Sequence, residues 1–405
     1  MIKLPVFFGV IPFLIFGAIC EEQVSLAEVD ELIVSPDRRD HLFARKEVGP
    51  TVNYSEDPDT YLEGYIQGLV DVHYYEFNVI VVVKQGVVTL YNLPQNKLTS
   101  NSIISFVSHL PEVKEEHRGE GKPVSDVTQM EEYEVRQQLN GIWFPQSTVL
   151  FQPLIADLLE PVYSAGYRWS DNPIGNHVVA VSFGDTFPVF RWTNVGPLNA
   201  DMQIDIQGGM WAIFNMWSGN EPDGEVAELV TTDYLVGFPL TFAFDEWSFR
   251  LRVYHVSSHL GDEFLVDNPG YARVNPSMEV LDFFTSYQAT QGIRLYFGPG
   301  WIFHSDKTFP MKNFYVEYGT EMRALGMKSF YHKIYGTPFL ALNWRNWEVN
   351  DWKFDGTYQL GYEWSKLQGV GRKVRLFFQY HHGYSEGQFF TDSTQYWSFR
   401  FSYGF

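Results

Sequence analysis

The residues whose types and spacing best suit chemistry are a histidine and a serine, His255 and Ser257, in a segment that alternates apolar and polar side chains. Alternate side chains of a β-strand point to the same face, so an imidazole and a hydroxyl two positions apart are neighbours. The imidazole can then act as the base for a serine nucleophile if a third group orients the ring. The spacing therefore predicts a nucleophile and a base on one strand face.

A carboxylate is the third group that such a pair requires. Glu279 begins the next expected strand and shares a face with that strand's apolar residues, which predicts a place near His255. Asp262 and Glu263, in the connector between the two strands, are alternative orienting groups and candidate ligands for a cation. The competing interpretation is a polar strand end without a chemical role. A hydrogen-bonded row on the outer wall favours chemistry, whereas side chains scattered in a lumen or loop favour the competing interpretation.

The elements that must position these residues are alternating strands. From Trp397 to Phe405 every odd position is aromatic and every even position is small or polar. Similar alternation recurs in segments 202–207, 293–304, 314–323, 354–364 and 373–380. Each strand is thus apolar on one face and polar on the other, as a membrane barrel requires, because a closed sheet leaves no unpaired backbone in lipid. The pattern predicts an all-β, antiparallel transmembrane β-barrel over residues 161–405.

The lengths of the connectors predict the orientation of the barrel, because outer-membrane barrels have short periplasmic turns and longer outer loops. Connectors near 385–393, 346–352, 306–313 and 260–276 are expected outside, and those near 366–372, 325–329, 289–292 and 244–246 in the periplasm. Extending this alternation back to about residue 162 gives roughly twelve strands, an even number as expected.

The predicted lumen carries charges of both signs. The inward-facing cations are Arg250, Arg252, Arg294, Arg323, Arg345, Arg375 and Arg400, and the anions are Asp205, Glu317, Glu321, Asp355 and Glu363. In a narrow barrel such charges can pair across the interior, which favours a filled lumen over an open pore. His381 and His382 adjoin an expected external loop and are expected to be solvated.

The first twenty residues have the shape of a secretory signal peptide, in which Lys3 precedes an apolar run from Leu4 to Ile19. Cys20, the only cysteine, offers an alternative site of lipidation. No later segment has the roughly 18 apolar residues of a membrane helix. The formal net charge of -20 argues against nucleic acid as a partner. These features predict export to the bacterial outer membrane.

Three segments lie between the expected signal peptide and the barrel. Residues 21–54, of mixed charge, are expected to be a linker. Residues 55–118 combine a helical pattern, a hairpin turning at 84–86 and a helix capped by Ser100, which predicts a small periplasmic α+β domain. Residues 119–160 form a connector whose apolar later part is expected to plug or gird the periplasmic end of the barrel.

Several resemblances extend this interpretation. The strand ending in Phe405 resembles the C-terminal signature of outer-membrane barrels, which implies outer-membrane lipids and the barrel-assembly machinery as partners. The segments KQGVVTLYN and ISFVSHLPEVKE resemble a BON domain, a periplasmic module linked to membrane-surface and phospholipid attachment. His-x-Ser-Ser at 255–258 resembles the His-x-Ser-Asn element that outer-membrane phospholipase A and the lipid A deacylases hold on the lipid-facing wall.

The chain as a whole resembles domain-of-unknown-function family 1207 of exported bacterial proteins, through the segments FQPLIADLLEP (151–161) and VYHVSSHLGDEFL (253–265). The expected function is therefore that of an outer-membrane β-barrel with a structural, transport or envelope-interaction role. The alternative is a lipid acyl hydrolase that uses Ser257, His255 and Glu279. The first role needs no cofactor, and for the hydrolase calcium is the candidate cofactor.

Overall fold

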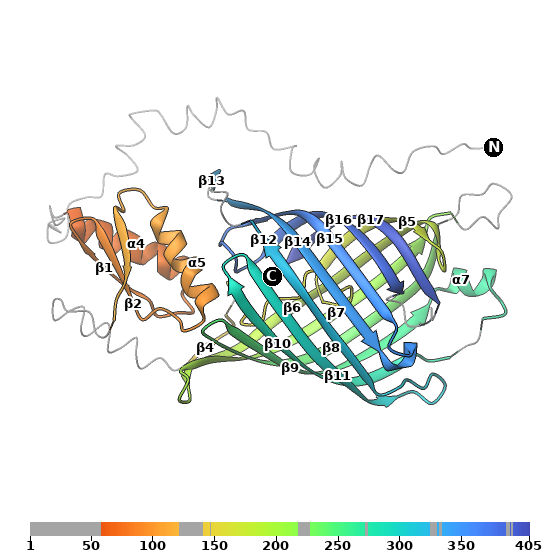
Figure 1. Ribbon diagram of the computed structural model, residues 1–405. Helices are drawn as coiled ribbons and strands as arrows, with labels where there is room; N and C mark the ends of the chain where they lie inside the picture. The colour runs from red at the N-terminus through yellow and green to blue at the C-terminus, as the bar shows by residue number, and fades with distance from the viewer. Residues whose placement is uncertain are drawn as a thin grey trace, which may run out of the picture. The chain divides into compact units, whose positions relative to one another are not determined.

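The computed structural model describes residues 58–120, 141–145, 147–217, 227–271, 274–324, 330–331, 334–385, 389 and 392–405. The expected signal peptide (1–20), the linker (21–54) and part of the connector (121–140) lie outside the described residues. The described chain forms a β-barrel preceded by a small domain with a three-stranded sheet (Figure 1). In this part of the chain none of the helices has the length and apolarity needed to cross a membrane.

The small domain alternates helices and strands in the order helix, strand, strand, helix, strand. These elements are α4 (Pro58–His73), β1 (Ile80–Lys84), β2 (Val87–Tyr91), α5 (Lys97–Ser108) and β3 (Glu115–Arg118). The expected hairpin joins β1 to β2, and both turn residues have positive φ, 56° at Gln85 and 77° at Gly86. Helix α5 begins earlier than expected, because the Asn96 side chain caps it by accepting the N–H of Thr99 at 3.1 Å.

The core of the small domain forms beneath one stripe of α4. Leu62, Ile66 and Val70 recur every four residues and are all buried, as the helical period requires. Leu367 and Val370 belong to the same apolar cluster and come from the turn between β15 (Phe354–Ser365) and β16 (Lys373–Tyr384) of the barrel. The small domain therefore shares its core with a turn of the barrel.

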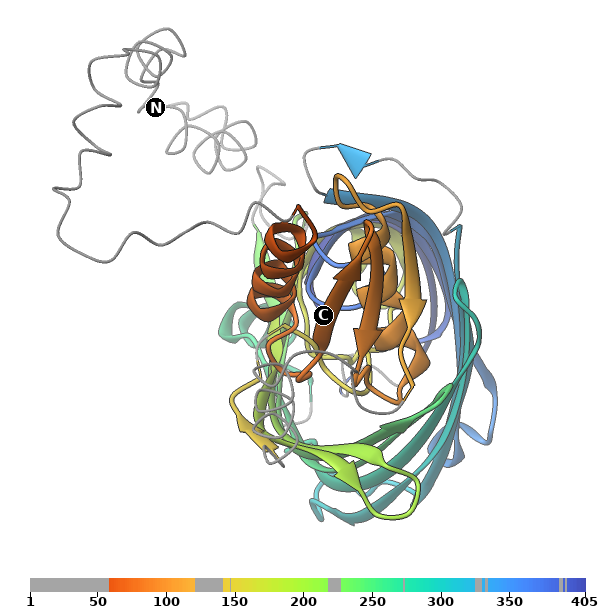
Figure 2. The ribbon, with the colours of Figure 1, turned by 90° about the vertical axis from the view of Figure 1, so that its left-hand side faces the viewer.

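Twelve antiparallel strands make the barrel wall (Figure 2). They are β5 (Tyr163–Asp171), β6 (Gly175–Val195), β7 (Ala200–Asn215), β8 (Glu228–Phe244), β9 (Trp247–Leu260), β10 (Ser277–Thr290), β11 (Ile293–Ser305), β12 (Phe314–Arg323), β14 (Ile334–Trp347), β15 (Phe354–Ser365), β16 (Lys373–Tyr384) and β17 (Ser393–Gly404). Consecutive strands pair, β12 pairs with β14, and β17 pairs with β5, which closes the wall. The predicted barrel of roughly twelve strands is confirmed.

The connectors differ in length at the two ends of the barrel. At one end, called here the short-turn end, Phe244 pairs with Trp247 and Thr290 pairs with Ile293 across tight turns. The opposite end carries the longer connectors, one of which contains α7 (Asp262–Asp267) and another η1 (Glu348–Asn350). The short strands β4 (Gly141–Trp143) and β13 (Phe330–Tyr331) pair with β6 and β14 respectively.

The wall is apolar outside and polar inside, as the sequence pattern predicts. In β17 the aromatic Trp397, Phe399 and Phe401 are exposed, while Ser398 and Arg400 between them are buried. This alternation follows from the two-residue period of a strand. Phe405 departs from it, because its ring is buried and lies 4.2 Å from the guanidinium of Arg372.

Residues 147–162 occupy the lumen. The ring of Phe151 packs against the inward-facing Phe284 and Tyr296. Arg294 donates from Nη2 to the carbonyl of Gln152 at 2.7 Å. Because these contacts reach inward-facing strand residues, the segment lies inside the barrel and fills part of its interior.

Ion pairs hold the lumen together. Arg250 binds Glu160 of the enclosed segment at 2.7 Å, and both side chains are at least 98% buried. Pairs between strands join Arg252 to Asp282 (2.5 Å), Arg294 to Glu321 (3.1 Å), Arg323 to Glu363 (2.9 Å), Arg345 to Asp355 (2.9 Å) and Arg375 to Glu363 (3.1 Å). The paired, filled lumen expected from the sequence is present.

One expectation about the lumen is wrong. His381 is fully buried, binds the Thr357 hydroxyl at 3.1 Å and the Tyr384 carbonyl at 2.9 Å, and is not solvated. The alternation of β16 places position 381 on the inward face, and this outweighs its nearness to a connector.

Candidate functional site

The strand register brings the sequence-predicted carboxylate to the sequence-predicted base. In the β9–β10 pair, His255 lies directly opposite Glu279 and Ser257 lies opposite Ser277. Tyr254 and Val256, on either side of His255, are buried in the lumen. His255, Glu279 and Ser257 therefore stand together on the outer wall, near the end with the long connectors.

Glu279 is hydrogen-bonded to the imidazole that it was expected to orient. The Nδ1 atom of His255 lies 2.9 Å from Oε1 of Glu279. Both side chains are partly exposed, at 45% and 32% of their surface. A carboxylate on Nδ1 fixes the ring and leaves Nε2 as the atom that can accept a proton, which is the arrangement of a serine-hydrolase base.

A second imidazole, which the sequence interpretation missed, shares the same carboxylate. His304 of β11 lies opposite Glu279, and its Nδ1 contacts Oε2. A β-bulge between Glu279 and Val280 pairs Val280 with Ile302 and shifts the register by one residue. This bulge carries His304 onto the outward face beside the exposed Phe303. Strict alternation could not predict the outward placement of His304. The only sign of it in the sequence is a polar residue that follows an apolar run.

Ser257 completes the row without a contact to His255. It occupies the next outward position of β9, and its cross-strand neighbour on β8 is the exposed Tyr234. Within the residues that the structure describes, no hydrogen bond links the Ser257 hydroxyl to the His255 ring. Hydrogen bonds of this kind are often long in a free enzyme and tighten when substrate binds.

The surroundings of the row are apolar on the side toward the barrel's middle. Leu281 is the next outward residue of β10, and its partner Trp301 on β11 is 46% exposed. On β8, the exposed Val236 lies opposite His255. The polar row thus lies at the boundary between the apolar wall and the long connectors.

Asp262 and Glu263 do not contact the row. They begin α7 and are exposed, and Glu279 is the carboxylate that meets His255. Across the described ranges of the chain, no group of three or more histidine, cysteine, aspartate or glutamate side chains has the arrangement of a metal site. Their role as cation ligands stays a prediction.

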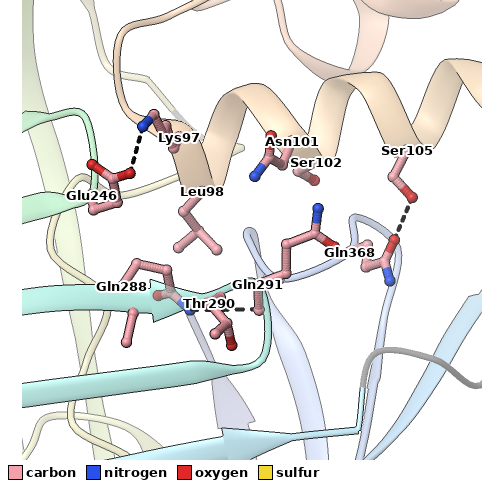
Figure 3. A pocket seen from close by; sticks show the side chains of 12 residues that line it. Lys97, Leu98, Asn101, Ser102, Ser105, Glu246, Gln288, Thr290, Gln291 and Gln368 are labelled. Atoms are coloured by element: carbon pink, nitrogen blue, oxygen red, sulfur yellow. Dashed lines mark hydrogen bonds and ion pairs between the residues drawn. The ribbon is translucent and has the colours of Figure 1, made fainter.

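A cavity lies at the short-turn end, where α5 meets three barrel turns (Figure 3). It is a cavity of about 140 Å³ lined mainly by amides and hydroxyls. Lys97 binds Glu246 at 2.5 Å on one side, and Ser105 donates to Gln368 on the other. The hydrogen bond to Glu246 raises the pKa of Lys97, and the same bond lowers the pKa of Glu246. These contacts fasten α5 to the barrel.

A closed, even-stranded wall with apolar side chains outside and paired charges inside defines the class of outer-membrane-type β-barrels. Within that class, the chain belongs to the family described as "Protein of unknown function (DUF1207)", whose model matches residues 75–405. No curated protein matches the sequence.

Solved barrels resemble the chain at low sequence identity. The outer membrane phospholipase (OMPLA) dimer of Salmonella typhi with bound calcium is 14% identical, with a TM-score of 0.40, covering 62% of this chain and 94% of that chain. Outer membrane phospholipase A from Escherichia coli is also 14% identical, with a TM-score of 0.40 and coverages of 60% and 93%. The transport unit of the Escherichia coli autotransporter AIDA-I is 13% identical, with a TM-score of 0.32 and coverages of 67% and 96%.

Proposed function

We propose that this protein is a bacterial outer-membrane barrel that hydrolyses acyl esters of lipids on its outer wall. The observation that carries the proposal is the hydrogen bond between His255 Nδ1 and Glu279 Oε1, with Ser257 on the same outward face. The support is geometric. A possible nucleophile (Ser257), a possible base (His255) and a carboxylate that orients the base (Glu279) lie at neighbouring outward positions of β9 and β10.

In the proposed reaction, the Ser257 hydroxyl oxygen attacks the carbonyl carbon of a lipid ester. Nε2 of His255 takes the hydroxyl proton and then gives it to the departing alcohol, so that an acyl-serine remains. Water, deprotonated by the same nitrogen, attacks the acyl carbon of the acyl-serine. The nitrogen then gives this proton to the departing serine oxygen, which releases a fatty acid and the free serine. Glu279 stabilises the imidazolium that forms in both steps, and His304 fixes the Glu279 carboxylate from its other oxygen.

The filled lumen supports a wall-based activity over transport. Residues 147–162 and the ion pairs around them occupy part of the interior, which favours an activity on the wall over passage of a solute through the barrel. A structural, envelope-interaction role is the second candidate, because α5 and the turn from Leu367 to Val370 fasten the small domain to the barrel.

The proposal includes an orientation of the barrel, and the lengths of the connectors support it. In outer-membrane barrels long connectors belong to the cell exterior and short turns to the periplasm, which supports a periplasmic position for the small domain. The helix, strand, strand, helix, strand order supports a BON-like domain. Export by a signal peptide, insertion by the barrel-assembly machinery and contact with outer-membrane lipids belong to the same proposal.

The test is fatty-acid release from phospholipid and from lipid A by the refolded protein in bilayers with calcium present. Ser257→Ala is expected to lower release by roughly a thousandfold or more, as loss of a serine nucleophile does. Ser258→Ala is the matched control, because Ser258 is the next residue, is buried in the lumen and should leave release unchanged. Glu279→Gln keeps the hydrogen bond without the charge and should lower the rate at saturating substrate.

Two outcomes would count against the hydrolase. One is no release by a wild-type protein whose folding is verified by its heat-dependent gel mobility. The other is release that survives in Ser257→Ala. Either result would leave the structural, envelope-interaction role as the function of the barrel.

A further inference from the structure

Four aromatic residues form a surface outside the barrel wall at the short-turn end, called here the aromatic shelf: Trp143, Phe144, Phe187 and Phe190. Strand β4 pairs with β6 beyond the point where β5 begins; Figure 1 labels the two strands. In this pairing Trp143 lies opposite Phe190. The two rings meet edge to face with centroids 4.8 Å apart. The connector thus adds a short strand to the outer edge of the wall.

The shelf faces away from the lumen. Arg191, between Phe190 and Trp192, is fully buried and binds the carbonyl of Thr148 inside the barrel at 2.8 Å. Phe190 therefore points outward, and Trp143 shares its face because directly paired residues of adjacent strands lie on the same side of a sheet. Trp143 is 65% exposed, which is high for a tryptophan.

The backbone conformation at Phe144 allows its ring to lie on the same outward face as Trp143. Its φ is 51°, in a region that bulky residues seldom adopt. Consecutive strand residues normally point to opposite faces, yet both rings of this pair are outward and exposed, with centroids 5.8 Å apart. The Phe144 ring also lies 5.9 Å from Phe187, which is 55% exposed on the outward face of β6. The shelf is continuous with the apolar outer wall.

The small domain is tied to the shelf. The Tyr75 hydroxyl, just after α4, donates to the carbonyl of Phe144 at 3.1 Å. Glu76, the next residue, is buried and accepts the N–H of Ser147 at 2.6 Å and the hydroxyl of Thr148 at 2.9 Å. Two adjacent residues of the small domain therefore hold Phe144 of the shelf and the first two residues of the enclosed segment.

We propose that the aromatic shelf lies in the headgroup and acyl boundary of the membrane leaflet at the short-turn end and holds the small domain at that membrane surface. Large amphipathic and aromatic rings concentrate at this boundary in membrane proteins. A lipid occupant follows from the continuity of the shelf with the outward face of β6. The proposal rests on the membrane location of the barrel and is independent of the proposed hydrolysis.

The experiment measures lipid contact at three single cysteines in the full-length protein, each labelled with a polarity-sensitive fluorophore in a Cys20→Ser background. The variants are Trp143→Cys on the shelf, Phe297→Cys on the exposed wall of β11 and Tyr61→Cys on the exposed face of α4. The vesicles are phosphatidylethanolamine and phosphatidylglycerol carrying a nitroxide at the headgroup or along the acyl chain. We expect headgroup nitroxide to quench position 143 about threefold more than position 61, because interfacial aromatic positions lie at headgroup level.

Comparison of positions 143, 297 and 61 distinguishes a failure of the shelf proposal from a failure of the proposed membrane location. Quenching at 297 together with a position 143 that behaves like position 61 would overturn the shelf proposal while retaining the membrane barrel. No quenching at 297 would refute the membrane location on which the shelf proposal and the hydrolase proposal both depend. Because labelling alters the residue under test, the unlabelled protein gives a second measurement. Quenching of tryptophan emission by brominated lipid should fall in Trp143→Phe, and equal quenching of the two proteins would also overturn the proposal.

Discussion

The ion pair between Arg250 and Glu160 offers the most direct test of the filled lumen. At 2.7 Å, the Coulomb attraction is about 6 kcal/mol for an effective dielectric constant of 20. Breaking a buried pair by removing one charge typically costs about 3–5 kcal/mol, because the other charge stays buried. Asp282 lies 4.0 Å from Arg250 but is already bound by Arg252. It can therefore replace little of the attraction that Arg250 loses when the charge of Glu160 is removed.

We therefore expect Glu160→Gln to lower the free energy of unfolding by about 3 kcal/mol, the lower end of that range, because the glutamine oxygen still accepts a hydrogen bond from Arg250. The assay is equilibrium unfolding in urea of the protein inserted in lipid vesicles, followed by tryptophan emission. Asp392→Asn is the control, because it removes the same charge at an exposed connector position and should change stability by less than about 0.5 kcal/mol. A loss below about 1 kcal/mol in Glu160→Gln would refute the burial of residues 147–162 in the lumen.

Three further outcomes are expected. The Lys97–Glu246 contact should loosen in acid, because its bond to Lys97 lowers the pKa of Glu246, and the stabilising effect is lost as the pH falls from the ordinary pKa of a glutamate through this lowered value. It should loosen again in alkali, because the same bond raises the pKa of Lys97, and the effect is lost as the pH rises from the ordinary pKa of a lysine through this raised value. Hydrogen exchange in α5 would report both losses. Phe151→Ala should lower the free energy of unfolding by about 3–5 kcal/mol by opening a cavity among buried rings, as urea titration would show. Gly319→Ala should lower the midpoint of heat-dependent gel mobility, because its Cβ would lie 2.3 Å from the backbone oxygen of Leu342 on the neighbouring strand.

The wall was predictable from sequence because strand alternation is local. A two-residue period fixes which side chains face out, so the β17 aromatics and the lumenal arginines fall where the pattern places them. The same rule put His255 and Ser257 on one outward face, and counting back from the next strand put Glu279 beside His255. These inferences needed only the period and the order of the strands.

The remaining features depend on contacts that no local pattern encodes. His304 reaches Glu279 through a bulge, which breaks the period at one residue. Arg294 binds the backbone carbonyls of Gln152 and Pro153, and any sequence supplies such carbonyls. The outward placement of Phe144 depends on a positive φ that residue type alone disfavours. The sequence pattern therefore does not predict register shifts, hydrogen bonds to backbone carbonyls or turns with unfavourable φ.

The enclosed position of residues 147–162 bears on the closure of the barrel wall. The segment precedes β5 in the chain, and the wall closes only when β5 meets β17, a pairing of distant parts of the chain that forms slowly. Arg250 and Arg294 of the wall both bind this segment, so a wall closed without it would leave Arg250 without the Glu160 carboxylate and Arg294 without a backbone acceptor. Residues 147–162 are therefore expected to stabilise the closed seam between β5 and β17, and a barrel that closes without them should be less stable than the native one.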